Sequence, residues 1–139
     1  MLSDSQRTHI LDAVPSFAAK WEQRCAEQAE YEARFPKGTW SAEERSHEFR
    51  TSLAWHLAGR IIQGELHEAE WFFAALEPLY GVADDDLDAE LTVGLLEDLI
   101  HSVEMEGAAD AGILHAVPKG PLTRGAWEAA YAYTHHAQE

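Results

Sequence analysis

Apolar residues along the chain recur at three- and four-residue spacing, in segments that proline and glycine separate. This spacing puts apolar side chains on one face of an α-helix, and the alternation typical of a β-strand is almost absent. The pattern therefore predicts an all-α fold, a single compact bundle of five to seven mostly antiparallel helices. The predicted helices cover about residues 4–13, 15–35, 41–61, 66–79, 84–106, 108–116 and 123–136.

The clearest start of a helix lies at Ser41. The segment Ser-Ala-Glu-Glu, residues 41–44, is a capping box, in which the serine and the second glutamate satisfy backbone N–H groups that the first turn leaves without partners. Apolar residues follow at four-residue spacing and form the face of this helix that we expect to be buried: Phe49, Leu53, Leu57 and Ile61.

The length and charge of the chain limit its partners. Its 139 residues suit one domain, residues 1–139, and its formal net charge is −15. This charge argues against nucleic acid or an anionic membrane as the main partner, because both require clustered Lys and Arg. It favours attraction of a basic protein or a cation.

The remaining composition indicates the compartment. The single cysteine, Cys25, excludes an internal disulfide framework. The first ten residues do not resemble a secretory signal, and no apolar run approaches the roughly 20 residues of a membrane span. We therefore expect a cytoplasmic protein.

Residues 82–107 begin with four acids in five positions and contain no Lys or Arg. Asp84, Asp86 and Asp88 match the first three ligand positions of an EF-hand loop, but Ala89 and Leu95 stand where that loop requires Gly and Glu. The EF-hand interpretation is therefore excluded. Carboxylates at the start of a helix also cap its free N–H groups, at about 0.3–1 kcal/mol each, and this accounts for part of the cluster.

A binding surface is the third interpretation of the acidic stretch. At 100° per residue, Glu90, Glu97 and Glu104 fall on one side of the helix, opposite its leucines, with Asp98 and His101 beside them. From residue 61 to 118 the chain has no Lys or Arg, although a solvated surface normally mixes both signs. The acids of this span are Glu65, Glu68, Glu70, Glu77, Asp84, Asp85, Asp86, Asp88, Glu90, Glu97, Asp98, Glu104, Glu106 and Asp110.

Catalytic and metal-binding patterns are weak. The pairs Glu97–His101, Asp98–His101 and His67–Glu70 have helical spacings that could hold a metal, but a Glu-x-x-His motif of the di-iron type is missing. The sequence also contains no glycine-rich phosphate loop and no Gly-x-Ser-x-Gly. We expect no catalytic residues, no metal site and no cofactor.

Three segments carry a resemblance to a known family. They are Val14-Pro15-Ser16-Phe17 with Trp21 one turn later, an aromatic-rich helix that leads into the acidic junction, and the helix over residues 92–99. Over about residues 10 to 105 the chain resembles small, acidic, all-helical bacterial proteins. These occur in polymorphic toxin and contact-dependent competition systems as immunity-type proteins. The resemblance implies tight binding to a toxin domain and brings no catalytic residues with it.

The leading hypothesis is a non-enzymatic immunity or inhibitor protein that neutralises a basic, nuclease-type toxin domain through an acidic surface. One alternative is a helical enzyme or metal-binding protein that uses carboxylates and histidines. Another is a regulatory module with a peptide groove built from Trp71, Phe72 and Phe73. The predicted partner-binding residues are Asp84, Asp85, Asp86, Asp88, Glu90, Glu97, Asp98, His101 and Glu104.

Overall fold

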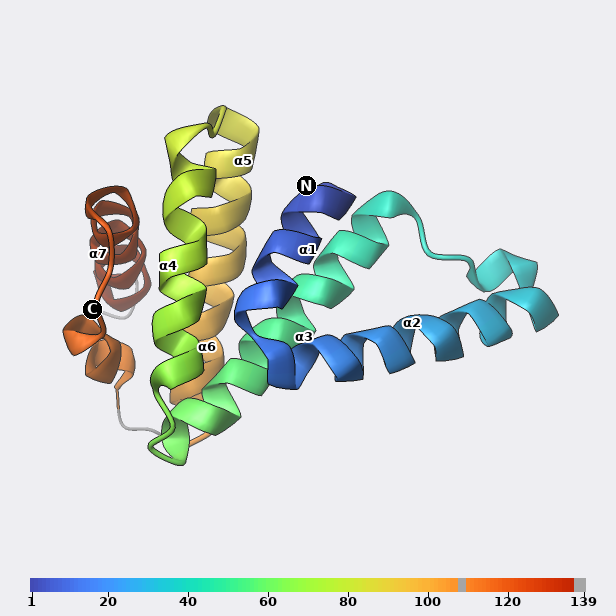
Figure 1. Cartoon of the computed structure of the whole chain (residues 1–139), viewed down its shortest axis with the longest axis horizontal. Coiled ribbons are helices and arrows are strands. Elements are labelled where there is room, and N and C mark those ends of the chain that lie inside the picture. Colours follow the sequence, from blue (N-terminus) through green and yellow to red (C-terminus); the bar gives the residue numbers. More distant parts are fainter. Residues whose placement is uncertain (108–109, 137–139) are drawn as a thin grey trace.

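The computed structural model describes residues 1–107 and 110–136, and its arrangement of helices is shown in Figure 1. The predicted all-α fold is confirmed, since the described residues contain seven α-helices and no β-strand. The helices are α1 (Asp4–Ala13), α2 (Pro15–Arg34), α3 (Ala42–Ile62), α4 (His67–Gly81), α5 (Asp85–Ala89), α6 (Glu97–Met105) and α7 (Pro121–His136). Two short 3₁₀ helices, η1 (Pro36–Gly38) and η3 (Ala111–Ala116), and a π-helical segment, η2 (Glu90–Leu96), complete the order.

The local start signals explain where the first helices begin. The predicted capping box is present at α3, where the Glu44 N–H donates to Ser41 Oγ (3.0 Å) and the Ser41 N–H donates to Glu44 Oε1 (3.1 Å). A second box, between Ser3 and Gln6, starts α1. The predicted helix over 108–116 begins outside the described residues, and its described part is the 3₁₀ helix η3.

The acidic stretch forms one continuous helical rod from α5 through η2 to α6. Figure 1 shows α4 antiparallel to this rod and α3 beside it. The rod and α3 run in the same general direction but cross at an angle (Figure 1). Ser46 and Arg50 of α3 both contact Glu90 near the start of the rod, and Arg50 also reaches Asp98 further along.

The core lies between α3, α4 and the rod, and it also takes in side chains from α1, α2, η3 and α7. The rings of Phe72 and Phe73 on α4 are fully buried, and Phe73 packs edge-on against Trp127 of α7. The predicted peptide groove built from Trp71, Phe72 and Phe73 is therefore wrong, because only Trp71 is exposed.

Helix α2 projects from the other helices as an arm (Figure 1). Near its base, Trp21 stacks on Trp40 with ring centroids 6.2 Å apart and meets Phe49 of α3 edge-on at 5.3 Å. These aromatic contacts fix the angle at which α2 leaves α3. Among the described residues, no helix combines the length and apolar character needed to cross a membrane.

Candidate functional site

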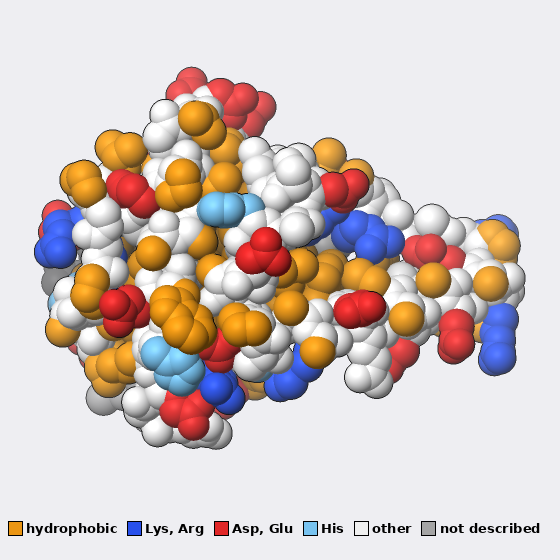
Figure 2. Space-filling model, viewed as in Figure 1, with side chains coloured by type: hydrophobic (Ala, Val, Ile, Leu, Met, Phe, Trp, Pro, Cys, Tyr) orange, Lys and Arg blue, Asp and Glu red, His pale blue; other side chains and the backbone are white. Residues whose placement is uncertain are grey.

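The predicted acidic residues separate into an exposed group and a group held in contacts with other helices. The exposed group is the acidic apex, which we define as Asp84, Asp85, Asp86 and Asp88. It lies where α4 turns into α5, and Figure 2 shows these carboxylates together at the top of the molecule. Asp84 also caps α5, since its Oδ1 accepts from the Leu87 N–H at 2.8 Å.

Within residues 1–107 and 110–136, no Lys or Arg forms an ion pair with any of the four aspartates of the acidic apex. Val82, two residues before the cluster, is 79% exposed. The apex therefore presents concentrated negative charge beside an apolar side chain, and only one of its carboxylates acts as the helix cap.

Glu90 and Asp98 belong to the second group, because both bind Arg50 of α3. Glu90 Oε1 lies 2.7 Å from Arg50 Nη1, and Asp98 Oδ2 lies 3.2 Å from Arg50 Nε. The side chains of Arg50 and Glu90 are only 19% and 14% exposed. Burial disfavours the charge on Arg50, but both carboxylates outweigh this effect and raise its pKa above the ordinary value. The pair thus joins the rod to α3.

The π-helical segment makes this arrangement possible. Two residues eight positions apart in a regular α-helix differ by about 80° around the helix axis. A π turn takes up one extra residue, which reduces the angle between them by about 100°. Glu90 and Asp98 therefore lie within roughly 20° of each other and face the same arginine. Between them, Gly94 leaves room for that arginine, since a Cβ there would lie 2.8 Å from Arg50 Cδ.

The predicted common face of Glu90, Glu97 and Glu104 is therefore wrong. Glu90 faces α3, while Glu104 faces α7, where its Oε2 lies 2.9 Å from His135 Nε2. Glu97 is half-buried, and burial together with the neighbouring Asp98 raises its pKa. Of the predicted residues on α6, only His101 is classed as exposed. The angular prediction failed because it assumed a regular 100° step through η2.

Two further acids of the span cap helices from a distance. Glu68 of α4 accepts from the Ser16 hydroxyl (2.6 Å) and backbone N–H (3.1 Å) at the start of α2. Glu77 accepts from the backbone N–H groups of Leu122 (3.1 Å) and Thr123 (2.9 Å) at the start of α7. Helix N-termini carry partial positive charge, so each of these carboxylates is stabilised by the start of the helix that it caps.

Glu68 ends a chain of hydrogen bonds that begins at the surface. Because the Ser16 hydroxyl donates to Glu68, it accepts from His56 Nε2 (2.6 Å), and His56 Nδ1 accepts from Lys20 Nζ (3.2 Å). Burial and the charge of Lys20 lower the pKa of His56, which keeps the ring neutral in this role. Burial raises the pKa of Glu68, but the Ser16 bonds and Arg60, whose Nε lies 3.2 Å away, lower it overall.

One group of described residues places three potential metal ligands within 4.8 Å of one another: Glu104, Asp110 and His135. The predicted pairs that involve His101 or His67 are not part of it. His135 Nδ1 contacts the Tyr131 carbonyl oxygen (2.8 Å), and Asp110 accepts from the Tyr131 hydroxyl (2.6 Å). The Tyr131 carbonyl and the two carboxylates raise the pKa of His135. His135 Nε2 lies 2.9 Å from Glu104 and 3.7 Å from Asp110, so the group links α6 and the residue before η3 to α7 without a metal.

Comparison with protein-family models, with curated proteins and with solved structures gives no match to this chain. The resemblance to immunity-type proteins therefore stays a prediction that rests on the sequence segments. The acidic apex, by contrast, is distinguished by the exposure of its four aspartates and by their lack of Lys or Arg partners in the described part of the chain. These two properties are the physical basis for a functional proposal.

Proposed function

We propose that this chain is a non-enzymatic inhibitor of the immunity type, which binds a basic protein partner through the acidic apex. The observation that supports it is the exposure of four aspartates without a compensating cation in the described part of the chain. Most of the other acids between residues 61 and 118 have structural partners. At the apex, four exposed carboxylates of this span lie together and are available to another molecule.

The physical advantage of such a surface lies in the rate of association. Complementary charge raises the association rate of two proteins from about 10⁵–10⁶ to as much as 10⁸–10⁹ M⁻¹s⁻¹ at low salt. A toxin domain that attacks nucleic acid carries a basic cleft for phosphates. Carboxylates of the apex would occupy the positions of those phosphates and close the cleft.

The other predicted contact residues belong to the periphery of this proposal. At 1.5 Å per residue, Glu97 and His101 lie roughly 13 and 20 Å along the rod from Asp88. A standard interface covers about 20–30 residues on each partner, so it can extend from the apex to these side chains. Glu90, Asp98 and Glu104 are held by Arg50 and His135, and we assign them a structural role first.

The experiment is affinity capture from the native lysate with a charge-neutralised apex. The variant D85N/D86N/D88N retains Asp84 and hence the cap of α5. The matched control E22Q/E30Q/E128Q removes the same charge from exposed positions on α2 and α7. The wild type and the control should retain the same basic polypeptide, and the apex variant should lose it. Equal retention by all three proteins would refute the apex as the binding surface.

A further inference from the structure

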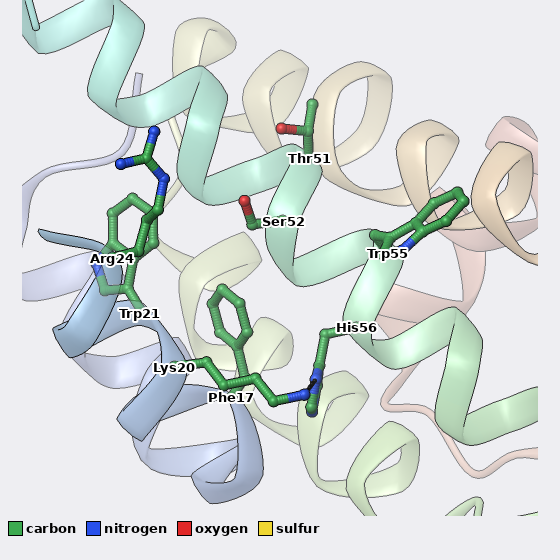
Figure 3. Close-up of a pocket in the computed structure, with 8 residues that line it drawn as sticks. All are labelled: Phe17, Lys20, Trp21, Arg24, Thr51, Ser52, Trp55 and His56. Carbon is green, nitrogen blue, oxygen red and sulfur yellow. Dashed lines mark hydrogen bonds between the residues drawn. The ribbon is translucent and has the colours of Figure 1, made fainter. Parts of the chain in front are cut away.

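A groove with a volume of about 600 Å³ lies between α2 and α3, away from the acidic apex. Figure 3 shows the side chains that line it. They come from two turns of each helix: Phe17, Lys20, Trp21, Arg24, Thr51, Ser52, Trp55 and His56. The volume falls in the range of about 300–1,000 Å³ that is typical of small-molecule sites.

The charge of this groove is opposite to that of the protein. In a chain of net charge −15, the lining contains two cations and no carboxylate. Arg24 is anchored, with Nε 3.4 Å from Glu48 and its guanidinium over the ring of Trp40. Lys20 makes one contact through Nζ, with the neutral ring of His56, so its ammonium retains donors for another acceptor.

The apolar part of the groove is aromatic. Phe17 and Trp21 are buried, with their rings stacked at 6.2 Å, and line the floor of the groove, while the residue Trp55 is 58% exposed. The hydroxyl of Ser52 has no hydrogen bond to any other residue in the described ranges. The groove therefore combines flat apolar surfaces, an available cation and a free hydroxyl, which together suit a planar organic anion.

We propose that this groove binds a small aromatic carboxylate, whose ring packs against Phe17, Trp21 and Trp55 and whose carboxylate accepts from Lys20. The bound anion accepts a charge-assisted hydrogen bond from a donor of Lys20 that His56 does not use. This site is independent of the acidic apex, because the two share no residue and lie on different elements.

The test uses the sodium salt of 2-naphthoic acid as the probe, titrated into the full chain by calorimetry. 2-Naphthalenemethanol, which has the same ring system without the charge, is the comparison ligand. We expect saturable binding of one 2-naphthoate per chain. The neutral alcohol should bind about tenfold more weakly, as expected for the loss of one charge-assisted hydrogen bond.

Matched variants connect the binding to the groove. Lys20→Gln should weaken 2-naphthoate binding about tenfold, whereas Lys37→Gln, at an exposed lysine of η1, should not change it. Trp55→Ala should weaken it too, whereas Trp71→Ala removes a comparably exposed ring on α4 and should have no effect. Absence of saturable binding, equal affinity for the alcohol, or equal affinity of Lys20→Gln and the wild type would each overturn the proposal.

Discussion

Replacing Gly94 by alanine tests whether Arg50 is held against the rod by Glu90 and Asp98. Inside a helix this change ordinarily raises the free energy of unfolding by about 0.5–1 kcal/mol, because alanine loses less backbone freedom on folding. At Gly94, however, the new Cβ would lie 2.8 Å from Cδ and 3.0 Å from Nε of Arg50. The arginine must therefore move away from its two carboxylates.

The expected size of the effect follows from these contacts. A hydrogen bond to a charged group contributes about 1.5–3 kcal/mol, and displacement of Arg50 weakens both of its bonds. If each hydrogen bond loses about half of its contribution, the free energy of unfolding falls by about 1.5–3 kcal/mol. This loss exceeds the stabilisation that alanine ordinarily brings inside a helix. We expect Gly94→Ala to lower the free energy of unfolding by about 1–2 kcal/mol, and Tm by about 3–8 °C.

Urea denaturation of matched variants measures this effect. Gly59 lies within α3 and has no atom within 4 Å of its hypothetical Cβ, so Gly59→Ala should raise the free energy of unfolding by about 0.5–1 kcal/mol. In an Arg50→Ala background, Gly94→Ala should become stabilising by a similar amount, since nothing then occupies the space. If Gly94→Ala stabilises the wild type as Gly59→Ala does, the reasoning about Arg50 is refuted.

Three further predictions concern single side chains. Glu68→Ala should lower the free energy of unfolding by about 3 kcal/mol in urea melts, because it leaves Arg60 and the start of α2 without their buried carboxylate; a loss under 1 kcal/mol would contradict this role. Asp84→Ala should lower the free energy of unfolding by about 1 kcal/mol, because α5 loses its cap, whereas Asp85→Ala should change it much less. The pKa of His135 is raised in the folded protein. Its contribution to the free energy of unfolding is therefore complete below about pH 6.5 and is lost as the pH rises through the folded-state pKa. The Tm of the wild type should therefore fall more between pH 6 and pH 8.5 than that of His135→Gln, and parallel curves would exclude this contribution.

The elements of the fold could be predicted because their signals are local. Helix spacing and the box at Ser41 depend on residues within one or two turns, and the structure confirms both. The π-helical segment could not be predicted in this way, because it depends on how Arg50 of α3 meets Gly94 of the rod. The error about the common face of Glu90, Glu97 and Glu104 follows directly from that segment.

The candidate site shows the same limit. The absence of Lys and Arg from residues 61–118 predicted uncompensated charge, but Arg50 and Arg60 of α3 lie outside this span and pair with its acids. Glu68 also caps α2, and Glu77 caps α7. The apex is where exposed acids of this segment without a Lys or Arg partner lie side by side in the described part of the chain. The groove between α2 and α3 was missed because its cations and rings are interleaved with core positions of both helices.

Binding through the acidic apex is tested most directly by the salt dependence of the association rate between this protein and the captured basic partner. Rates are measured between 50 and 500 mM salt for the wild type, D85N/D86N/D88N and E22Q/E30Q/E128Q. Steering by the apex predicts a rate that falls steeply with salt for the wild type and the control. The apex variant should be slower at low salt and respond much less. If the association rate of the apex variant equals that of the wild type at every salt concentration, the apex does not steer the partner.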